Sequence, residues 1–143
     1  MKKLTSALTA VFLGMSAPAL ALELDYICDF HKESSGLIAE STTFIFDNDL
    51  EHVVISNEII RYARKRPIKV KVSIRRNGEY QAQWQLDLPV SMEGIGQQGK
   101  WSAKYRIIYE ARIAANFGKA KMNARLKKGG FRTQSSGECR SKN

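Results

Sequence analysis

Two cysteines, Cys28 and Cys139, are the residues of this sequence with the most distinctive chemistry. An even cysteine count is typical of a disulfide in a protein that leaves the cytoplasm. A reactive thiol or a metal ligand is the alternative, but neither cysteine has a histidine at a metal-binding spacing. We therefore expect an intramolecular disulfide and predict no metal site.

The two histidines are the next candidates for chemistry, because imidazole is the commonest general base. His31 and His52 each border a predicted strand, and no G-x-S-x-G nucleophile motif accompanies them. With no motif-bearing site, we predict no catalytic residue and a protein that is not an enzyme. A cryptic enzyme remains an alternative, because a His-Asp-Ser arrangement is recognised by geometry and not by sequence spacing.

The segment GIGQQG, which begins at Gly94, matches the G-x-G-x-x-G pattern of dinucleotide-binding loops. Such a site needs a strand before the glycines, a helix after them and an acidic residue about 20 residues further on. Alternating side chains predict a strand after this segment instead of a helix. We interpret GIGQQG as a loop between two hairpins and predict no cofactor.

Charge is the strongest compositional signal, at a formal +9 over 143 residues. Residues 22–60 hold nine acids and one base, whereas residues 61–143 hold five acids and twenty bases. Such asymmetry predicts an anionic envelope component or an acidic protein as the partner, and it would also suit contact with a membrane surface. The alternative is that the two halves neutralise each other across the fold.

The densest basic run precedes Pro67 and consists of Arg61, Arg64, Lys65 and Arg66. It indicates either contact with an anion or membrane surface, or simply a solvated segment. Nucleic acid is not expected, because base stacking would need aromatic residues on the basic face and they fall on the apolar one. We expect the protein to be a monomer.

The first residues of the chain are typical of a secretory signal peptide. Lys2 and Lys3 are followed by a mostly apolar run and then by a small-x-small site that ends at Ala21. The run is too short to span a membrane. The sequence therefore predicts a signal peptide over residues 1–21, a single β domain over residues 22–143, and a periplasmic or secreted location.

The cysteines, histidines and basic residues described above are expected to lie on or beside β-strands, because most of the chain alternates between apolar and polar side chains. In residues 22–30, Tyr26 and Cys28 share one face, and acidic residues occupy the other. Further strands are predicted at residues 42–46 and 52–56, followed by a short helix capped by Ser56 or Asn57.

The stretch RRNGEY, residues 75–80, predicts a hairpin through its Asn-Gly pair. A two-residue turn would set every apolar residue opposite a polar one. A three-residue loop with Gly78 left-handed pairs Arg75 with Glu79 and gathers the apolar residues on one face. That register predicts the inner pairs Ile74–Tyr80, Val72–Ala82, Val70–Trp84 and Ile68–Leu86.

Residues 101–127 are rich in helix formers, but their apolar side chains share a face only on strands. The whole chain then reads as seven or eight sequential antiparallel strands of an all-β fold. Cys28 and Cys139 both occupy inward-facing positions of the first and last predicted strands, so a disulfide would join those strands. We predict a small up-and-down barrel, which resembles lipocalin-like barrels in topology alone; a sandwich is the alternative.

The two strand faces predict two candidate sites. The outer faces are expected to form a continuous anion-binding basic stripe, interrupted only by Glu79 and Glu110: Lys69, Lys71, Arg75, Lys104, Arg106, Arg112, Lys121, Arg125 and Arg132. The inner aromatic residues, with Phe131 among them, are expected to fill the core. The alternative is an apolar cavity lined by Tyr80, Trp84, Trp101, Tyr105 and Tyr109.

These features together predict an exported, non-enzymatic binding module. Its partner would be an anionic or amphiphilic envelope component, such as a lipid, lipopolysaccharide or a small apolar ligand. The first alternative is an inhibitor of a basic hydrolase such as a lysozyme, whose surface the acidic half of the chain would meet.

Overall fold

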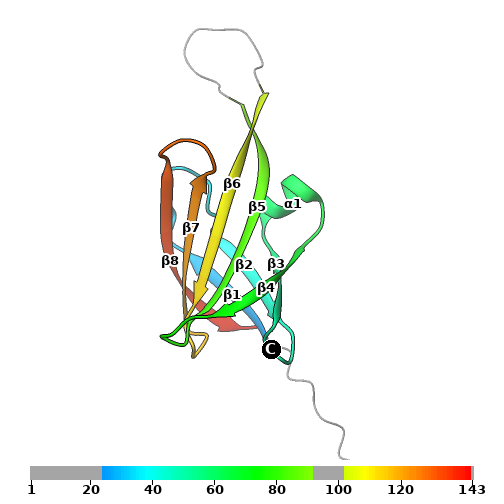
Figure 1. The fold of residues 1–143 in the computed structure, drawn as a ribbon, viewed down its shortest axis with the longest axis vertical. Coiled ribbons are helices and arrows are strands. Elements are labelled where there is room, and N and C mark those ends of the chain that lie inside the picture. Colours follow the sequence, from blue (N-terminus) through cyan, green and yellow to red (C-terminus); the bar gives the residue numbers. More distant parts are fainter. Residues whose placement is uncertain (1–23, 92–101, 143) are drawn as a thin grey trace, which may run out of the picture.

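The computed structural model of this protein describes residues 24–91 and 102–142, which form a closed barrel of eight antiparallel strands (Figure 1). The strands follow one another around the barrel in chain order, and the last strand pairs with the first. The predicted up-and-down barrel is thus confirmed over a sandwich. The predicted signal peptide, the GIGQQG segment and Trp101 lie outside the described residues.

The elements follow the alternation of apolar and polar side chains. In chain order they are β1 (Leu24–Phe30), β2 (Ser41–Phe46), β3 (His52–Ser56), α1 (Glu58–Arg64), β4 (Ile68–Ile74), β5 (Tyr80–Ser91), β6 (Ser102–Ile113), β7 (Lys119–Leu126) and β8 (Arg132–Ser141). The helix formers of β6 and β7 adopt strands because the sheet buries one face of each, which outweighs local propensity.

The barrel closes where β1 meets β8, and a covalent bond joins the two strands there. Cys28 and Cys139 are direct partners in the β1–β8 register and form the predicted disulfide. Gly137 is required nearby, because a Cβ at that position would collide with the backbone carbonyl oxygen of Asp29. The disulfide spans 111 positions of the sequence, and closing a loop of this length stabilises by about 4–5 kcal/mol in the chain-entropy model.

The β4–β5 hairpin has the predicted loop, but its strands stay paired over only part of their length. The Arg75 N–H donates a 2.9 Å hydrogen bond to the Glu79 carbonyl oxygen, and Gly78 has a φ of 83°. The predicted pairs Ile74–Tyr80 and Val72–Ala82 are confirmed. The predicted pairs Val70–Trp84 and Ile68–Leu86 are wrong, because the β4–β5 ladder ends at the Val72–Ala82 pair and the two strands separate beyond it.

The barrel interior holds one contiguous hydrophobic core. Trp84 and Tyr109 are cross-strand partners within it, and their rings stack with centroids 5.4 Å apart. The Tyr109 hydroxyl donates a 2.9 Å hydrogen bond to the Leu37 carbonyl oxygen. Burial and the nearby Glu33 carboxylate raise the pKa of Tyr109, so this hydroxyl stays a neutral donor at physiological pH.

The loop between β1 and β2 covers one end of the barrel, where Ile38 is buried. Glu33 fastens this loop: its carboxylate accepts hydrogen bonds from the backbone N–H groups of Ser35 and Ile38. The hydroxyls of Ser35 and of Thr133 on β8 donate to the same carboxylate. Burial alone would raise the pKa of Glu33, but these donors outweigh it and lower the value to about 2.

Aromatic rings cover the opposite end, where the β6–β7 turn folds inward. Phe117 has a left-handed φ of 58°, and its ring lies between those of Tyr26 and Tyr80 at centroid distances of 4.6 and 5.0 Å. Phe131 was predicted to face inward, and this is wrong, because it lies in the β7–β8 turn and is 45% exposed.

Candidate functional site

The outer faces of β5 to β8 carry their side chains in rows, because alternate residues point outward and the register aligns them across strands. One row is Gln83–Glu110–Asn123–Gln134, and the next is Gln85–Ile108–Arg125–Arg132. These rows bring together four amide side chains and two arginines from four neighbouring strands.

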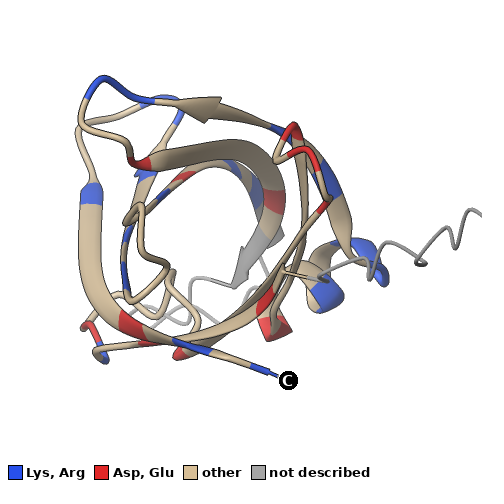
Figure 2. Ribbon diagram, turned by 90° about the horizontal axis from the view of Figure 1, so that it is seen from below, with Lys and Arg blue, Asp and Glu red and all other residues tan. Residues whose placement is uncertain are grey.

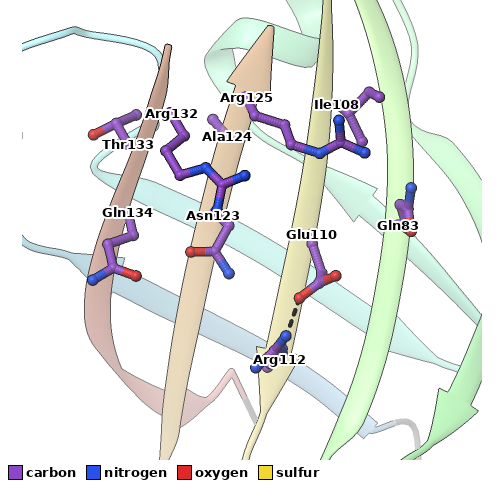
Figure 3. Close-up of a pocket in the computed structure, with 10 residues that line it drawn as sticks. All are labelled: Gln83, Ile108, Glu110, Arg112, Asn123, Ala124, Arg125, Arg132, Thr133 and Gln134. Atoms are coloured by element: carbon purple, nitrogen blue, oxygen red, sulfur yellow. Dashed lines mark hydrogen bonds and ion pairs between the residues drawn. The ribbon is translucent and has the colours of Figure 1, made fainter. Parts of the chain in front are cut away.

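A hollow of about 650 Å³ lies over these two rows, and we call it the β5–β8 groove (Figure 3). Its lining includes the cations Arg112, Arg125 and Arg132, and the acid Glu110. The Ile108 side chain also lines it and is 8% exposed although it belongs to the outer face. The groove therefore combines a small apolar patch with a mostly polar, mostly cationic rim.

The acid of the groove is already engaged by its neighbours. Arg112 Nε lies 2.7 Å from one carboxylate oxygen of Glu110, and Gln81 Nε2 donates a 3.0 Å hydrogen bond to the other. Within the groove, Glu110 thus neutralises Arg112 and leaves the other two arginines uncompensated.

Arg125 and Arg132 are direct cross-strand partners between β7 and β8. Both are exposed, and neither forms an ion pair with an acid in the described part of the chain. Arg125 extends across β6 toward Ile108, and Arg132 extends across β7 toward Asn123 (Figure 3). Like charges directly opposite each other destabilise a sheet. The electrostatic repulsion between Arg125 and Arg132 is therefore unfavourable, and an anion bound between them would offset it.

The groove has the chemistry of an anion receptor. A guanidinium offers a planar fork of donors that matches a phosphate or carboxylate group. The side-chain amides of Gln83, Asn123 and Gln134 line the same hollow and add neutral donors. Sequence reasoning missed these amides; their outer parity was readable, but the register that joins β5, β6, β7 and β8 was not.

The predicted basic stripe is present in pieces and not as one continuous surface. Arg112, Arg125 and Arg132 line the groove, and Lys121 is exposed on the outer face of β7 beside Arg112. The remaining predicted residues are exposed elsewhere on β4, on its turn and on β6: Lys69, Lys71, Arg75, Lys104 and Arg106. The outer face of β5 carries no base, so it separates the cations of β4 from those of β6 to β8.

Asp87 is a further interruption, in addition to the predicted Glu79 and Glu110. The Nε of Arg106 lies 2.9 Å from one carboxylate oxygen of Asp87. The hydrogen bond from Arg106 lowers the pKa of Asp87, and the same contact raises the pKa of Arg106. Arg106 is therefore partly neutralised, unlike Arg125 and Arg132.

The predicted cavity residues divide between different parts of the barrel. Trp84 and Tyr109 lie in the core, and Tyr80 belongs to the aromatic cluster at the end covered by Phe117. Tyr105 is half-buried and lines a second surface hollow between β6 and β7.

The two histidines support the fold. His52 Nδ1 lies 3.3 Å from a carboxylate oxygen of Asp47 in the β2–β3 turn. The backbone N–H of His31 donates to Ser136 on β8, and its carbonyl oxygen accepts a 2.6 Å hydrogen bond from the Ser135 hydroxyl. Both histidines thus have structural contacts that bind β1 to β8 or close a turn.

No family model, curated protein or solved structure matches this chain. Over residues 24–91 and 102–142, no group of three or more His, Cys, Asp or Glu side chains is placed to hold a metal ion. In the same residues, no helix is long and apolar enough to cross a membrane.

Proposed function

We propose that this protein is an exported binding module whose β5–β8 groove contacts an anionic component of the cell envelope. The opposed pair Arg125 and Arg132 is the observation that supports this proposal most strongly. An anionic group between the two guanidiniums would replace their repulsion with charge-assisted hydrogen bonds on both sides. Lipid phosphates and the phosphates of lipopolysaccharide have the required charge and geometry.

The surface next to the groove supports the same partner class. A second hollow, of about 580 Å³, continues along β6 and β7 and is lined by Lys104, Lys127 and Lys128. Asp87 is the acid in this hollow, and it is held by Arg106. A partner with several anionic groups, such as a membrane surface, would contact both hollows at once.

The location of the protein is part of the proposal. The disulfide between Cys28 and Cys139 is consistent with a protein outside the cytoplasm, where thiols are oxidised. Together with the signal peptide predicted over residues 1–21, it supports the periplasm or secretion as the destination. Anionic envelope components would be within reach in either place.

A flotation assay with lipid vesicles tests the proposal. Wild type is compared with Arg125→Glu/Arg132→Glu, using anionic and neutral vesicles at low and physiological salt. A well-placed cation contributes about 1 kcal/mol to binding an anionic surface, so reversing two charges should weaken binding at least about tenfold. The matched control is Arg75→Glu/Arg76→Glu, which makes the same charge change in the exposed β4–β5 turn.

We expect wild type and the turn control to float with anionic vesicles at low salt, and less so as salt screens the contact. The groove variant should stay at the bottom of the gradient. Equal binding by wild type and the groove variant, or no wild-type binding at low salt, would contradict the proposal. Co-purification of a basic hydrolase in place of lipid would favour the inhibitor alternative.

A further inference from the structure

The barrel wall opens between β4 and β5, on a different side from the β5–β8 groove. The ladder between these strands ends at the Val72–Ala82 pair. Beyond it, β4 continues against β3 down to the Ile55–Ile68 pair, while β5 continues against β6. Helix α1 lies beside β5 at this opening (Figure 1). We call the opening the β4–β5 seam.

Helix α1 closes only part of the seam. Asn57 caps the helix by accepting a 2.8 Å hydrogen bond from the Ile60 N–H, and its Nδ2 donates to Thr42 on β2. Ile60 is fully buried, so the helix is fixed onto the core. The helix ends at Lys65, which adopts a left-handed conformation that directs the chain into β4.

A hollow of about 540 Å³ remains between the end of α1 and the two strands. Its cationic lining consists of Arg64, Arg66 and Lys69, all exposed, and no acid lines it. Figure 2 shows basic residues of this region on the outside of the barrel wall. None of these three cations forms an ion pair in the described part of the chain.

The deeper lining of the seam is apolar. Ile68 and Trp84 line it and are 7% and 5% exposed, and Val70 is half-buried beside them. The hollow therefore has a cationic rim over an apolar floor, which matches a molecule with one charged end and one apolar end.

Trp84 has a hydrogen-bonding group that nothing in the described chain satisfies. Its Nε1–H is buried and has no hydrogen-bond partner in residues 24–91 and 102–142. A buried donor without an acceptor is unfavourable, and most such groups in native proteins have a partner. Because this atom has almost no accessible surface, an oxygen atom of a bound ligand would reach it only with a small movement of the seam.

We propose that the β4–β5 seam binds a small amphiphilic anion, with its acid group at Arg64, Arg66 and Lys69 and its apolar part against Ile68 and Trp84. The cations supply charge complementarity to the acid group, and Ile68 and Trp84 supply an apolar floor for the rest of the molecule. This second site is independent of the groove. Its ligand is a single molecule that carries a phosphate or carboxylate on an alkyl chain.

Tryptophan fluorescence gives a local measurement, because the chain has two tryptophans and Trp84 lines the seam. In Trp101→Phe, the emission reports on Trp84 alone. Octyl phosphate is the amphiphilic probe, while inorganic phosphate and octanol supply its charged and apolar parts separately. We expect a saturable change in Trp84 emission with octyl phosphate, at a Kd at least tenfold lower than with either part.

The site variant is Arg64→Gln/Lys69→Gln in the Trp101→Phe background, and its matched control is Arg125→Gln/Arg132→Gln in the groove. The site variant should bind octyl phosphate at least tenfold more weakly, whereas the groove control should bind it like its parent. Thermal unfolding confirms that each variant is folded. The groove is tested by vesicle flotation and the seam by Trp84 fluorescence. Failure of the groove proposal and failure of the seam proposal are therefore distinguishable.

Three results would overturn the seam proposal. One is the lack of a saturable change in Trp84 emission with octyl phosphate. Another is equal binding by the site variant and its parent. The third is equal affinity for inorganic phosphate and octyl phosphate, because the apolar floor would then contribute nothing.

Discussion

The acidic half of the protein, β1 to β3, and the basic half, β4 to β8, use their charges differently. In the acidic half, Glu33 fastens the β1–β2 loop and Asp47 closes the β2–β3 turn through hydrogen bonds from the backbone. In the basic half, Arg125 and Arg132 face each other with no acid partner in the described chain. Glu33 and Asp47 thus hold the backbone of the fold, whereas Arg125 and Arg132 have no such structural contact in the described residues.

The ion pairs of the described residues bear on whether the two halves neutralise each other, which is the alternative that the sequence left open. Among the described ion pairs, Asp29 with Arg140 joins an acid of the first half to a base of the second. The other Arg–carboxylate pairs, of Arg106 and Arg112, lie within the basic half. Of these three Arg–carboxylate pairs, one therefore joins the two halves and two lie within the basic half.

Removing the Cys28–Cys139 disulfide, which joins the acidic half to the basic half, should lower stability more than any other change considered. Cys28→Ala/Cys139→Ala removes the bond that closes β1 onto β8, and we expect a loss of about 4 kcal/mol in the free energy of unfolding. Denaturant unfolding measures it, with the same experiment in high salt as a comparison. If high salt destabilises wild type more than the substitution does, charge and not the disulfide holds the halves together.

Removing the charge of Glu33 should have the next largest effect. Glu33→Gln weakens four hydrogen bonds to a carboxylate, which should lower the free energy of unfolding by about 1–2 kcal/mol after allowance for solvent screening. Glu40→Gln makes the same change at an exposed position close in sequence and should be neutral. Vesicle binding should be unchanged in both; a loss of binding in Glu33→Gln would mean that the acids are not purely structural.

The Glu33 contribution should also depend on pH with a definite sign. Its pKa is about 2 in the folded protein against 4.5 for the free group, so the charged form is favoured by folding. The stability difference between wild type and Glu33→Gln should be full above about pH 5 and should shrink as pH falls toward 2. Unfolding measured from pH 2 to 7 tests this, and a difference that grows in acid would contradict it.

The smallest effect is expected at Asp87, where an acid lies within the basic half. Its pair with Arg106 is about half exposed, so Asp87→Asn should change the free energy of unfolding by less than about 1 kcal/mol. The same substitution frees Arg106 and should strengthen flotation with anionic vesicles. Unchanged or weaker flotation would show that Arg106 does not belong to the binding surface.

Much of the fold was readable from alternation and turn chemistry. The alternation of apolar and polar residues put Cys28 and Cys139 on the inner faces of the first and last strands, which predicted their pairing. The Asn-Gly pair predicted the β4–β5 loop. Both predictions use only the side-chain alternation of a strand and the residue preferences of a turn. The separation of β4 from β5 beyond the Val72–Ala82 pair was not predicted, because it depends on tertiary packing and not on the turn. Phe131 has the inner parity of Thr133 and Ser135, but it lies one residue before β8 begins and is therefore not held in the sheet.

The candidate site was readable only in part, for a similar reason. Outer parity identified Arg125 and Arg132 as exposed cations, but their direct opposition follows from the length of the β7–β8 turn. Asp87 shares the outer parity of Gln83 and Gln85, so its interruption of the basic surface was available to sequence reasoning and was missed. The unpartnered Nε1 of Trp84 depends on the whole core and has no sequence signal.

Side-chain amide resonances offer the most direct test of the claim that the basic half binds and the acidic half does not. Gln83, Asn123 and Gln134 line the groove, while Asn48 is exposed in the acidic β2–β3 turn. Isotope-labelled protein is titrated with nanodiscs that contain anionic lipid. The account predicts that the amide signals of Gln83, Asn123 and Gln134 shift or broaden while that of Asn48 stays unchanged. Equal changes at Asn48, or changes there alone, would contradict it.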